Sequence, residues 1–238
     1  MTNKKYKHVY FDLDNTLWDF NQNSRRAMQL AFQEFKIAEN SQVGFEIFFD
    51  VYSGHNRLLW KQYRNRQVTK NELIVKRFNN TFEDLNIKGI NPDNMNAFYL
   101  QVMPGSNVLV NGALDVLRYL KKKNYALYII TNGFKEVQYQ KLKGSGILPF
   151  FDKVYISEVI KKNKPAKEVF EYAVKSANAK KKQSIMVGDD WEADILGALN
   201  FGIDAVYFSQ NKNGNKTKAY PKNKLYRIDS LHELTKIL

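Results

Sequence analysis

Val9-Tyr10-Phe11-Asp12-Leu13-Asp14-Asn15-Thr16-Leu17 is an apolar run that ends in two carboxylates two residues apart. Because side chains alternate across an extended chain, Asp12 and Asp14 are expected to leave a strand end on the same side. Carboxylates this close repel each other unless a metal ion, a nearby cation or a proton on one of them relieves the repulsion. A plain strand end would have the same pattern, so the rest of the chain has to decide between the two interpretations.

The chain changes character at Pro104. Residues 18–104 have apolar positions at helical spacing, including a capping box at Thr69–Glu72 and a helix start at Asn23 or Ser24. After Pro104, helical segments alternate with short apolar ones, and Pro165 is expected in the first turn of a helix. Beyond the first strand, we expect strands at 125–131, 153–157, 184–187, 205–208 and 225–228. The pattern predicts an α/β protein: residues 1–16 and 105–238 form a doubly wound parallel sheet, and 17–104 form an inserted, all-helical domain.

The amino-acid composition indicates where the protein is located and which kind of metal it could bind. The 238 residues contain no apolar run near the roughly 18 needed for a membrane helix, and the basic N-terminus does not continue as a signal peptide. We therefore expect a cytoplasmic protein without a membrane partner. There are no cysteines and only three histidines, so any metal should have oxygen ligands, which favours Mg²⁺.

The net charge of +13 raises the question of a nucleic-acid partner. The basic residues are mostly lysines spread along the whole chain, with runs where helices should end, and such lysines are usually solvated. No arginine-rich arm, zinc finger or aromatic RNA-binding signature is present. Charge alone supports nucleic-acid binding only as an alternative, and we expect a monomer or a dimer with a small-molecule substrate.

Polar residues follow several of the expected strands, at the edge where doubly wound sheets bind ligands. Each has a plain explanation: a threonine can simply end a strand, a lysine can be solvated and an aspartate can cap a helix. Together they supply a nucleophilic carboxylate, a hydroxyl, a lysine and acids for Mg²⁺, which phosphoryl transfer requires. These residues are Asp12, Asp14, Thr131, Lys164, Asp189, Asp190 and Asp194.

Four segments resemble the motifs of the haloacid dehalogenase (HAD) superfamily: Asp12–Leu17, Ile130–Gly133, Lys164-Pro165 and Gly188–Asp194. The resemblance implies that Asp12 forms an aspartyl-phosphate, and that Asp14 is the general acid and base while its backbone carbonyl binds Mg²⁺. It further implies phosphate binding by Thr131, Asn132 and Lys164, and metal binding by Asp12 and Asp189. Asp190 and Asp194 would support the metal or orient Lys164. An acid at position 14 favours phosphate chemistry over dehalogenation.

The insert resembles the helical C1 cap of subfamily I, which closes over the active site and contacts the substrate. Candidate substrate residues are Trp18, His55, Arg57, Trp60 and Arg64. For Trp60 the alternative is packing in the core, and for His55 it is a structural or surface role.

The Leu17–Phe20 segment and the cap length are most similar to the pyrimidine 5′-nucleotidase group, which implies a nucleoside monophosphate substrate. Phosphoglycolate or sugar-phosphate hydrolysis stays open within the superfamily. Outside it, the alternatives are a phosphorylatable receiver-like switch and a nucleic-acid-binding protein.

Overall fold

The computed structural model describes residues 5–209 and 223–238 of the chain. Its contacts divide the chain into a larger unit, Met1–Phe20 with Val108–Leu238, and a helical unit, Asn21–Asn107. The larger unit contains a parallel sheet with helices on both faces, so the predicted α/β class with an inserted helical segment is confirmed.

One six-stranded sheet forms the centre of the larger unit, in the order β3-β2-β1-β4-β5-β6, and every neighbouring pair is parallel. The strands are β1 (His8–Phe11), β2 (Ala126–Thr131), β3 (Lys153–Ile156), β4 (Ser184–Gly188), β5 (Asp204–Phe208) and β6 (Leu225–Ile228). Phe11, the last residue of β1, pairs with Ile129 of β2 and Val187 of β4. The order of strands along the sheet reverses beside β1, and ligands of doubly wound sheets bind at such a point, beyond the carboxyl ends of the strands.

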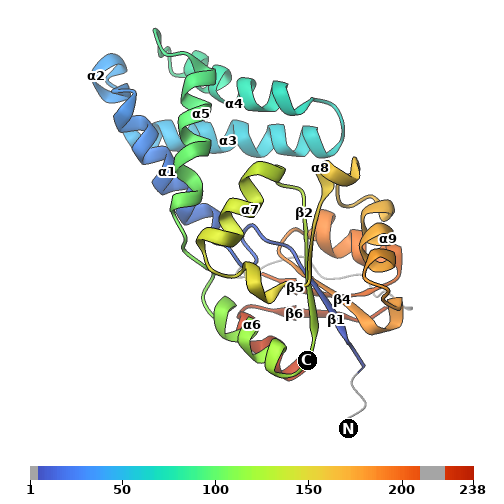
Figure 1. The fold of residues 1–238 in the computed structure, drawn as a ribbon. Helices are drawn as coiled ribbons and strands as arrows, with labels where there is room; N and C mark the ends of the chain where they lie inside the picture. Colours follow the sequence, from blue (N-terminus) through green and yellow to red (C-terminus); the bar gives the residue numbers. More distant parts are fainter. Residues whose placement is uncertain (1–4, 210–222) are drawn as a thin grey trace. The chain divides into compact units, whose positions relative to one another are not determined.

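Helices of the larger unit cover the sheet, and Figure 1 shows α6 and α9 on opposite sides of it. The α-helices are α6 (Ala113–Lys122), α7 (Lys135–Gly144), α8 (Ser157–Ile160), α9 (Lys167–Ser176), α10 (Gly197–Phe201) and α11 (Leu234–Ile237). The short turns are the 3₁₀ helices η2 (Leu148–Phe150), η3 (Lys181–Gln183) and η5 (Leu231–Glu233), and the π-helix η4 (Trp191–Leu196).

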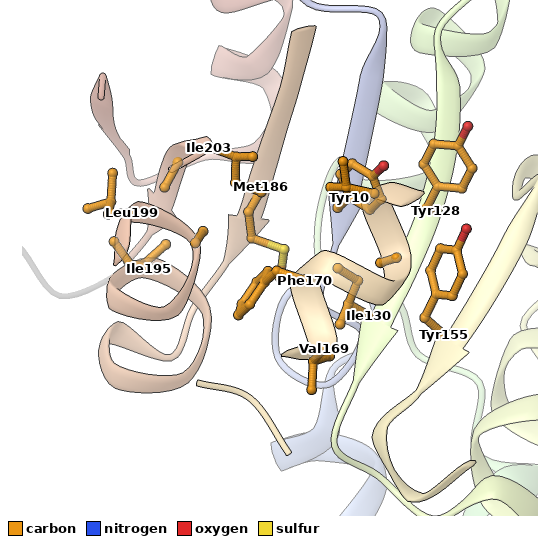
Figure 2. Packing of buried hydrophobic residues seen from close by; sticks show 14 residues of the cluster. Tyr10, Tyr128, Ile130, Tyr155, Val169, Phe170, Met186, Ile195, Leu199 and Ile203 are labelled. Carbon is orange, nitrogen blue, oxygen red and sulfur yellow. The ribbon is translucent and has the colours of Figure 1, made fainter. Parts of the chain in front are cut away.

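A buried apolar cluster fixes the sheet against α9 and α10 (Figure 2). Tyr10, Tyr128 and Met186 come from three adjacent strands, and the rings of Tyr10 and Tyr128 stack with centroids 4.8 Å apart. Phe170 of α9 packs into the same cluster. Burying a side chain of this size contributes about 1.5–3 kcal/mol, so the cluster holds the ends of β1, β2 and β4 in a fixed relation.

Two predicted helix boundaries are wrong, and a third predicted helix begins at the expected residue but has a different form. The helix expected to contain Pro165 begins at Lys167, because Pro165 lies in the preceding turn. The helix predicted from Trp191 is present, but its first part is π-helical. Asn23 and Ser24 lie inside α1 rather than at its start, and the Ser24 hydroxyl is hydrogen-bonded to that of Tyr99 at 2.8 Å.

The helical unit contains α1 (Phe20–Glu34, which starts at the boundary), α2 (Ile37–Ser41), α3 (Phe45–Arg64), α4 (Lys70–Asp84), α5 (Pro92–Val102) and the 3₁₀ turn η1 (Met103–Gly105). The capping box at Thr69 and Glu72 is confirmed, with each side chain bonded to the other's backbone N–H. Within residues 5–209 and 223–238, the helices are all too short or too polar to cross a bilayer.

Candidate active site

The chain turns sharply just beyond β1. The backbone N–H of Asp12 donates to the Val187 carbonyl at 2.9 Å, which continues the pairing with β4 by one residue. Asn15 has a φ of 59°, in the left-handed region that asparagine tolerates better than most residues. Its N–H donates to the Trp18 carbonyl at 2.7 Å. This turn follows directly after Asp14.

Lys164 connects the ends of three strands. Its Nζ donates to Asp12 Oδ1 at 2.6 Å, to Asp194 Oδ1 at 2.6 Å and to the Ile130 carbonyl at 2.7 Å. These bonds account for all three protons of the ammonium group. The lysine side chain is 2% exposed, and the Asp12 and Asp194 side chains are 11% and 1% exposed. The alternative explanation, that Lys164 is a solvated surface lysine, is therefore wrong, because the lysine is buried between two acids.

The cluster contains three acids, Asp12, Asp189 and Asp194, but only one lysine, Lys164, among the described residues that pair with them. Burial raises the pKa of Asp12 to about 7, although the Lys164 ammonium acts in the opposite direction. Burial also raises the pKa of Asp194, and burial together with the charges of Asp12 and Asp194 raises the pKa of Asp189 well above its usual range. For Lys164, burial lowers the pKa, but the two carboxylates outweigh it and the pKa is raised. A further cation would stabilise the ionised acids.

Asp12, Asp189 and Asp194 each offer a carboxylate oxygen, and these three oxygens lie within 4.8 Å of one another. Both oxygens of Asp194 are in use, since Oδ2 accepts the Asp190 backbone N–H at 3.1 Å. Asp189 Oδ1 accepts from the Thr16 hydroxyl at 3.0 Å. In the described part of the chain, Oδ2 of Asp12 and Oδ2 of Asp189 accept no hydrogen bond. Those two oxygens could hold a cation, and an all-oxygen donor set suits Mg²⁺.

Thr131 and Asn132, at the end of β2, have different partners. The Thr131 hydroxyl oxygen accepts from the Gly133 N–H at 3.1 Å and from Gln138 Nε2 at 2.6 Å, so its own proton is left to donate to an anion. The Asn132 side chain donates to the Lys164 carbonyl at 3.0 Å and accepts the Lys164 N–H at 2.9 Å. Asn132 thus holds the loop that carries Lys164.

Asp14 is held by helix α7. Lys141 Nζ donates to Asp14 Oδ1 at 2.6 Å, and Gln138 Nε2 donates to Asp14 Oδ2 at 2.8 Å. The Lys141 side chain is 3% exposed, whereas that of Asp14 is 27% exposed. The Lys141 ammonium lies 4.4 Å from the ring centre of Trp18 and 5.4 Å from that of Phe20. Sequence reasoning missed both Gln138 and Lys141.

A signal for these two residues is present in the sequence. The buried face of α7, with the residue before it, has positions at i, i+3, i+4, i+7 and i+8, the spacing of a core-facing helix stripe: Phe134, Val137, Gln138, Lys141 and Leu142. Two of these five positions are polar. A polar side chain at a core-facing position needs a partner, so the stripe itself indicates buried hydrogen-bonding groups.

The other supporting acid, Asp190, lies at the start of η4. Its Oδ1 accepts from the backbone N–H groups of Glu192 at 3.0 Å and Ala193 at 2.9 Å. Capping of this kind satisfies backbone donors at the start of a helix. Asp190 thereby fixes the first turn of η4, which carries Asp194.

Four of the five candidate substrate residues lie together on α3, and the fifth does not. His55 Nε2 is 2.8 Å from Asp84 Oδ2, and Trp60 packs edge-on against Tyr63 with ring centres 5.6 Å apart. Arg57 is exposed and Arg64 is partly buried. Trp18 is fully buried in the larger unit. A role in substrate binding stays a prediction for all five.

The site therefore combines a buried nucleophile-type carboxylate, a buried lysine, a hydroxyl donor and oxygen ligands for a cation. The chain belongs to the haloacid dehalogenase-like hydrolase family, whose sequence model matches residues 6–202. The family expected from the motifs is confirmed.

Relatives that match nearly the whole chain include two pyrimidine 5′-nucleotidases. PynA of Streptococcus pneumoniae, a pyrimidine 5′-nucleotidase, is 32% identical over 229 residues, which cover 95% of this chain and 93% of PynA. YjjG of Escherichia coli, also a pyrimidine 5′-nucleotidase, is 30% identical over 235 residues, 98% of each chain. Among solved structures, YfnB of Bacillus subtilis bound to magnesium has a TM-score of 0.86 at 27% identity, covering 99% of each chain.

Proposed function

We propose that the chain, a phosphatase of the haloacid dehalogenase-like family, hydrolyses nucleoside 5′-monophosphates with Mg²⁺ through an aspartyl-phosphate on Asp12. The observation that carries the proposal is the state of Asp12: one carboxylate oxygen is bonded to the buried Lys164 and the other accepts no bond from the described residues. Such a carboxylate is oriented for attack on phosphorus.

The reaction has two steps. In the first, an Asp12 oxygen forms a bond to phosphorus and the bond to the leaving alkoxide breaks, while the Asp14 carboxyl, which enters this step protonated, gives that alkoxide its proton and becomes a carboxylate. In the second, water attacks the phosphoryl group, Asp14 takes a proton from the water, and phosphate leaves with the Asp12 carboxylate restored. The proton returns to Asp14, so the cycle balances.

The remaining residues bind the phosphoryl group. The Thr131 hydroxyl donates to a phosphoryl oxygen, and Lys164 neutralises charge beside Asp12. Asp12, Asp189 and the Asp14 carbonyl would hold Mg²⁺, which supplies positive charge for the phosphoryl oxygens when bound. Magnesium in the YfnB structure and the oxygen donor set found here both support this assignment.

The nucleotide preference rests on the relatives. PynA and YjjG, which match this chain over more than nine-tenths of its length, are pyrimidine 5′-nucleotidases. We infer that pyrimidine nucleoside 5′-monophosphates are the substrates, uridine or thymidine nucleotides among them.

A substrate panel tests the proposal. Phosphate release is measured from nucleoside monophosphates, sugar phosphates and phosphoglycolate, with Mg²⁺ and with chelator, and Asp12→Asn serves as the control for contaminating phosphatases. We expect Mg²⁺-dependent turnover that is fastest with pyrimidine nucleotides. Faster turnover of phosphoglycolate or a sugar phosphate would overturn the nucleotide assignment, and uptake of a single equivalent of phosphate would indicate a receiver-like switch instead.

A further inference from the structure

Two buried side chains of α7, Gln138 and Lys141, have no role in the chemistry described above, yet both donate to Asp14. We propose that they are positioning residues that hold the Asp14 carboxylate by one oxygen each and aim it at the leaving group. The inference rests on the proposed phosphatase function. It adds two residues from a helix that carries none of the candidate catalytic groups.

The burial of Lys141 calls for an explanation, because α7 also carries the exposed lysines Lys135 and Lys143. Burying an ammonium group costs several kcal/mol unless a charge partner compensates for it. Lys141 obtains that compensation from Asp14 Oδ1 at 2.6 Å and from the rings of Trp18 and Phe20. All three partners lie within seven residues along the chain, so one lysine fixes the whole turn that follows Asp14.

Gln138 links Asp14 to the phosphate site. Its Nε2 group donates to Asp14 Oδ2 at 2.8 Å and to the Thr131 hydroxyl at 2.6 Å, which uses both amide protons. The Gln138 carbonyl oxygen is buried and has no partner among the described residues. Leaving a buried acceptor unpaired costs about 1–3 kcal/mol. The bonds that the amide donates to Asp14 and Thr131 offset that cost and keep the side chain in this orientation.

Gly133 makes room for this arrangement. A Cβ at position 133 would collide with the amide of Gln138. The backbone of the Thr131–Gly133 turn and the Gln138 side chain are therefore packed as one unit. Through that unit, the hydroxyl that would bind the phosphoryl group and the carboxylate that would protonate the leaving group are held by the same amide.

The role predicts a specific defect. Without its two donors, the Asp14 carboxylate is free to rotate away from the leaving oxygen. An alkoxide leaving group needs the proton that Asp14 supplies when the bond to phosphorus breaks, whereas p-nitrophenolate leaves without one. Loss of positioning should therefore slow hydrolysis of a nucleotide much more than hydrolysis of p-nitrophenyl phosphate. A general loss of structure would slow both equally.

The test compares Lys141→Met and Gln138→Leu with Lys143→Met and Gln140→Leu, matched changes at exposed positions of the same helix. The value of kcat/KM, which covers the steps up to the aspartyl-phosphate, is measured for uridine 5′-monophosphate and p-nitrophenyl phosphate with Mg²⁺. For Lys141→Met, which loses only the bond to Asp14, we expect a loss of about 10²-fold on the nucleotide and below about 10-fold on the aryl phosphate. For Gln138→Leu, which also loses the bond to the Thr131 hydroxyl, we expect losses on both substrates, with the larger loss on the nucleotide. The exposed variants should match the wild type, and Lys141→Arg should recover part of the nucleotide activity.

The outcomes separate the two proposals. Active wild-type protein with equal losses on both substrates, or with no loss in either buried variant, would overturn the positioning role and leave the phosphatase function intact. Wild-type protein that releases no phosphate from either substrate would overturn the phosphatase function, and the positioning role with it. Thermal unfolding of each variant identifies any that does not fold. If Lys141→Met unfolds, Gln138→Leu and Lys141→Arg still decide the question.

Discussion

Asp12 and Asp14 lie two residues apart, and each is paired with a different lysine. Asp12 bonds to Lys164, 152 residues away in the sequence, and Asp14 bonds to Lys141, 127 residues away. The repulsion expected between the two acids is thus relieved by two separate cations. The spacing of the acids is visible in the sequence, but the pairing of each with its own cation depends on which helices the sheet brings to that edge.

Lys164 was a site candidate from the sequence and Lys141 was not, and the difference has a physical cause. A lysine in the last turn of a helix is favoured by the helix dipole and is usually solvated, so Lys141 gives no local signal. Its burial follows from the packing of α7, in which it takes a core-facing position beside Leu142. Only the spacing of the whole stripe shows that this lysine is directed inward.

Asp189→Asn is expected to stabilise the metal-free protein. Because the pKa of Asp189 is raised in the folded state, folding favours the protonated form, and the ionised carboxyl weakens the fold as pH rises through that pKa. Asparagine removes the charge and keeps an acceptor for Thr16. In chelator at about pH 8, we expect the unfolding temperature to rise by about 2–4 °C, the shift that about 1 kcal/mol produces in a protein of this size.

The difference in stability between Asp189→Asn and the wild type should change sign when Mg²⁺ is added and should disappear in acid. Mg²⁺ should raise the unfolding temperature of the wild type by mass action and raise that of Asp189→Asn much less. Below about pH 4 the carboxyl is protonated in both states and the two proteins should unfold together. Glu192→Gln, an exposed change three residues away, should have no such effect. An Asp189→Asn variant that is less stable in chelator, or equally stabilised by Mg²⁺, would contradict the cation site.

Strand β4 and the π-helix η4 form one structural element at the site. The N–H groups of Asp194 and Ile195 both donate to the Asp190 carbonyl, at 2.9 Å and 3.3 Å, and the second bond makes the turn π-helical. In this wide turn the Asp194 carboxylate accepts hydrogen bonds from the Asp190 N–H and from Lys164 Nζ. Sequence periodicity predicts a helix here but not a π-helix, because the extra width depends on these tertiary bonds.

Gly188→Ala tests that element. A Cβ at position 188 would collide with the Asp194 carboxylate, so the variant should push η4 away from β4. We expect a loss of about 1–3 kcal/mol in the free energy of unfolding, typical of overpacking, together with lower phosphatase activity. Gly54→Ala is the control: apart from the backbone of its own helix, no heavy atom lies within 4 Å of the added Cβ, and alanine at this exposed position of α3 should stabilise by up to about 1 kcal/mol. Equal stability of the two variants would show that Asp194 does not need the glycine.

At the scale of the whole molecule, the alternation of strands and helices was sufficient to predict the architecture. All six strands lie where the apolar runs predict them, and parallel order then brings their carboxyl ends to one edge. Helix ends were predicted less well, since Ser24 and Pro165 are engaged in tertiary contacts or turns that local rules do not describe. The chemistry of the site is spread over four segments, after β1, β2, β3 and β4, and only the fold joins them.

The central claim is that Asp12 becomes covalently phosphorylated during turnover, and one measurement addresses it directly. The protein is mixed with uridine 5′-monophosphate and Mg²⁺, quenched in acid during turnover, digested and examined by mass spectrometry. We predict one phosphoryl group on the peptide that contains Asp12, and none in Asp12→Asn, which should stay folded because Lys164 keeps its bonds to Asp194 and the Ile130 carbonyl. Phosphate release by the wild type without phosphorylation of Asp12, or undiminished release by Asp12→Asn, would contradict the account.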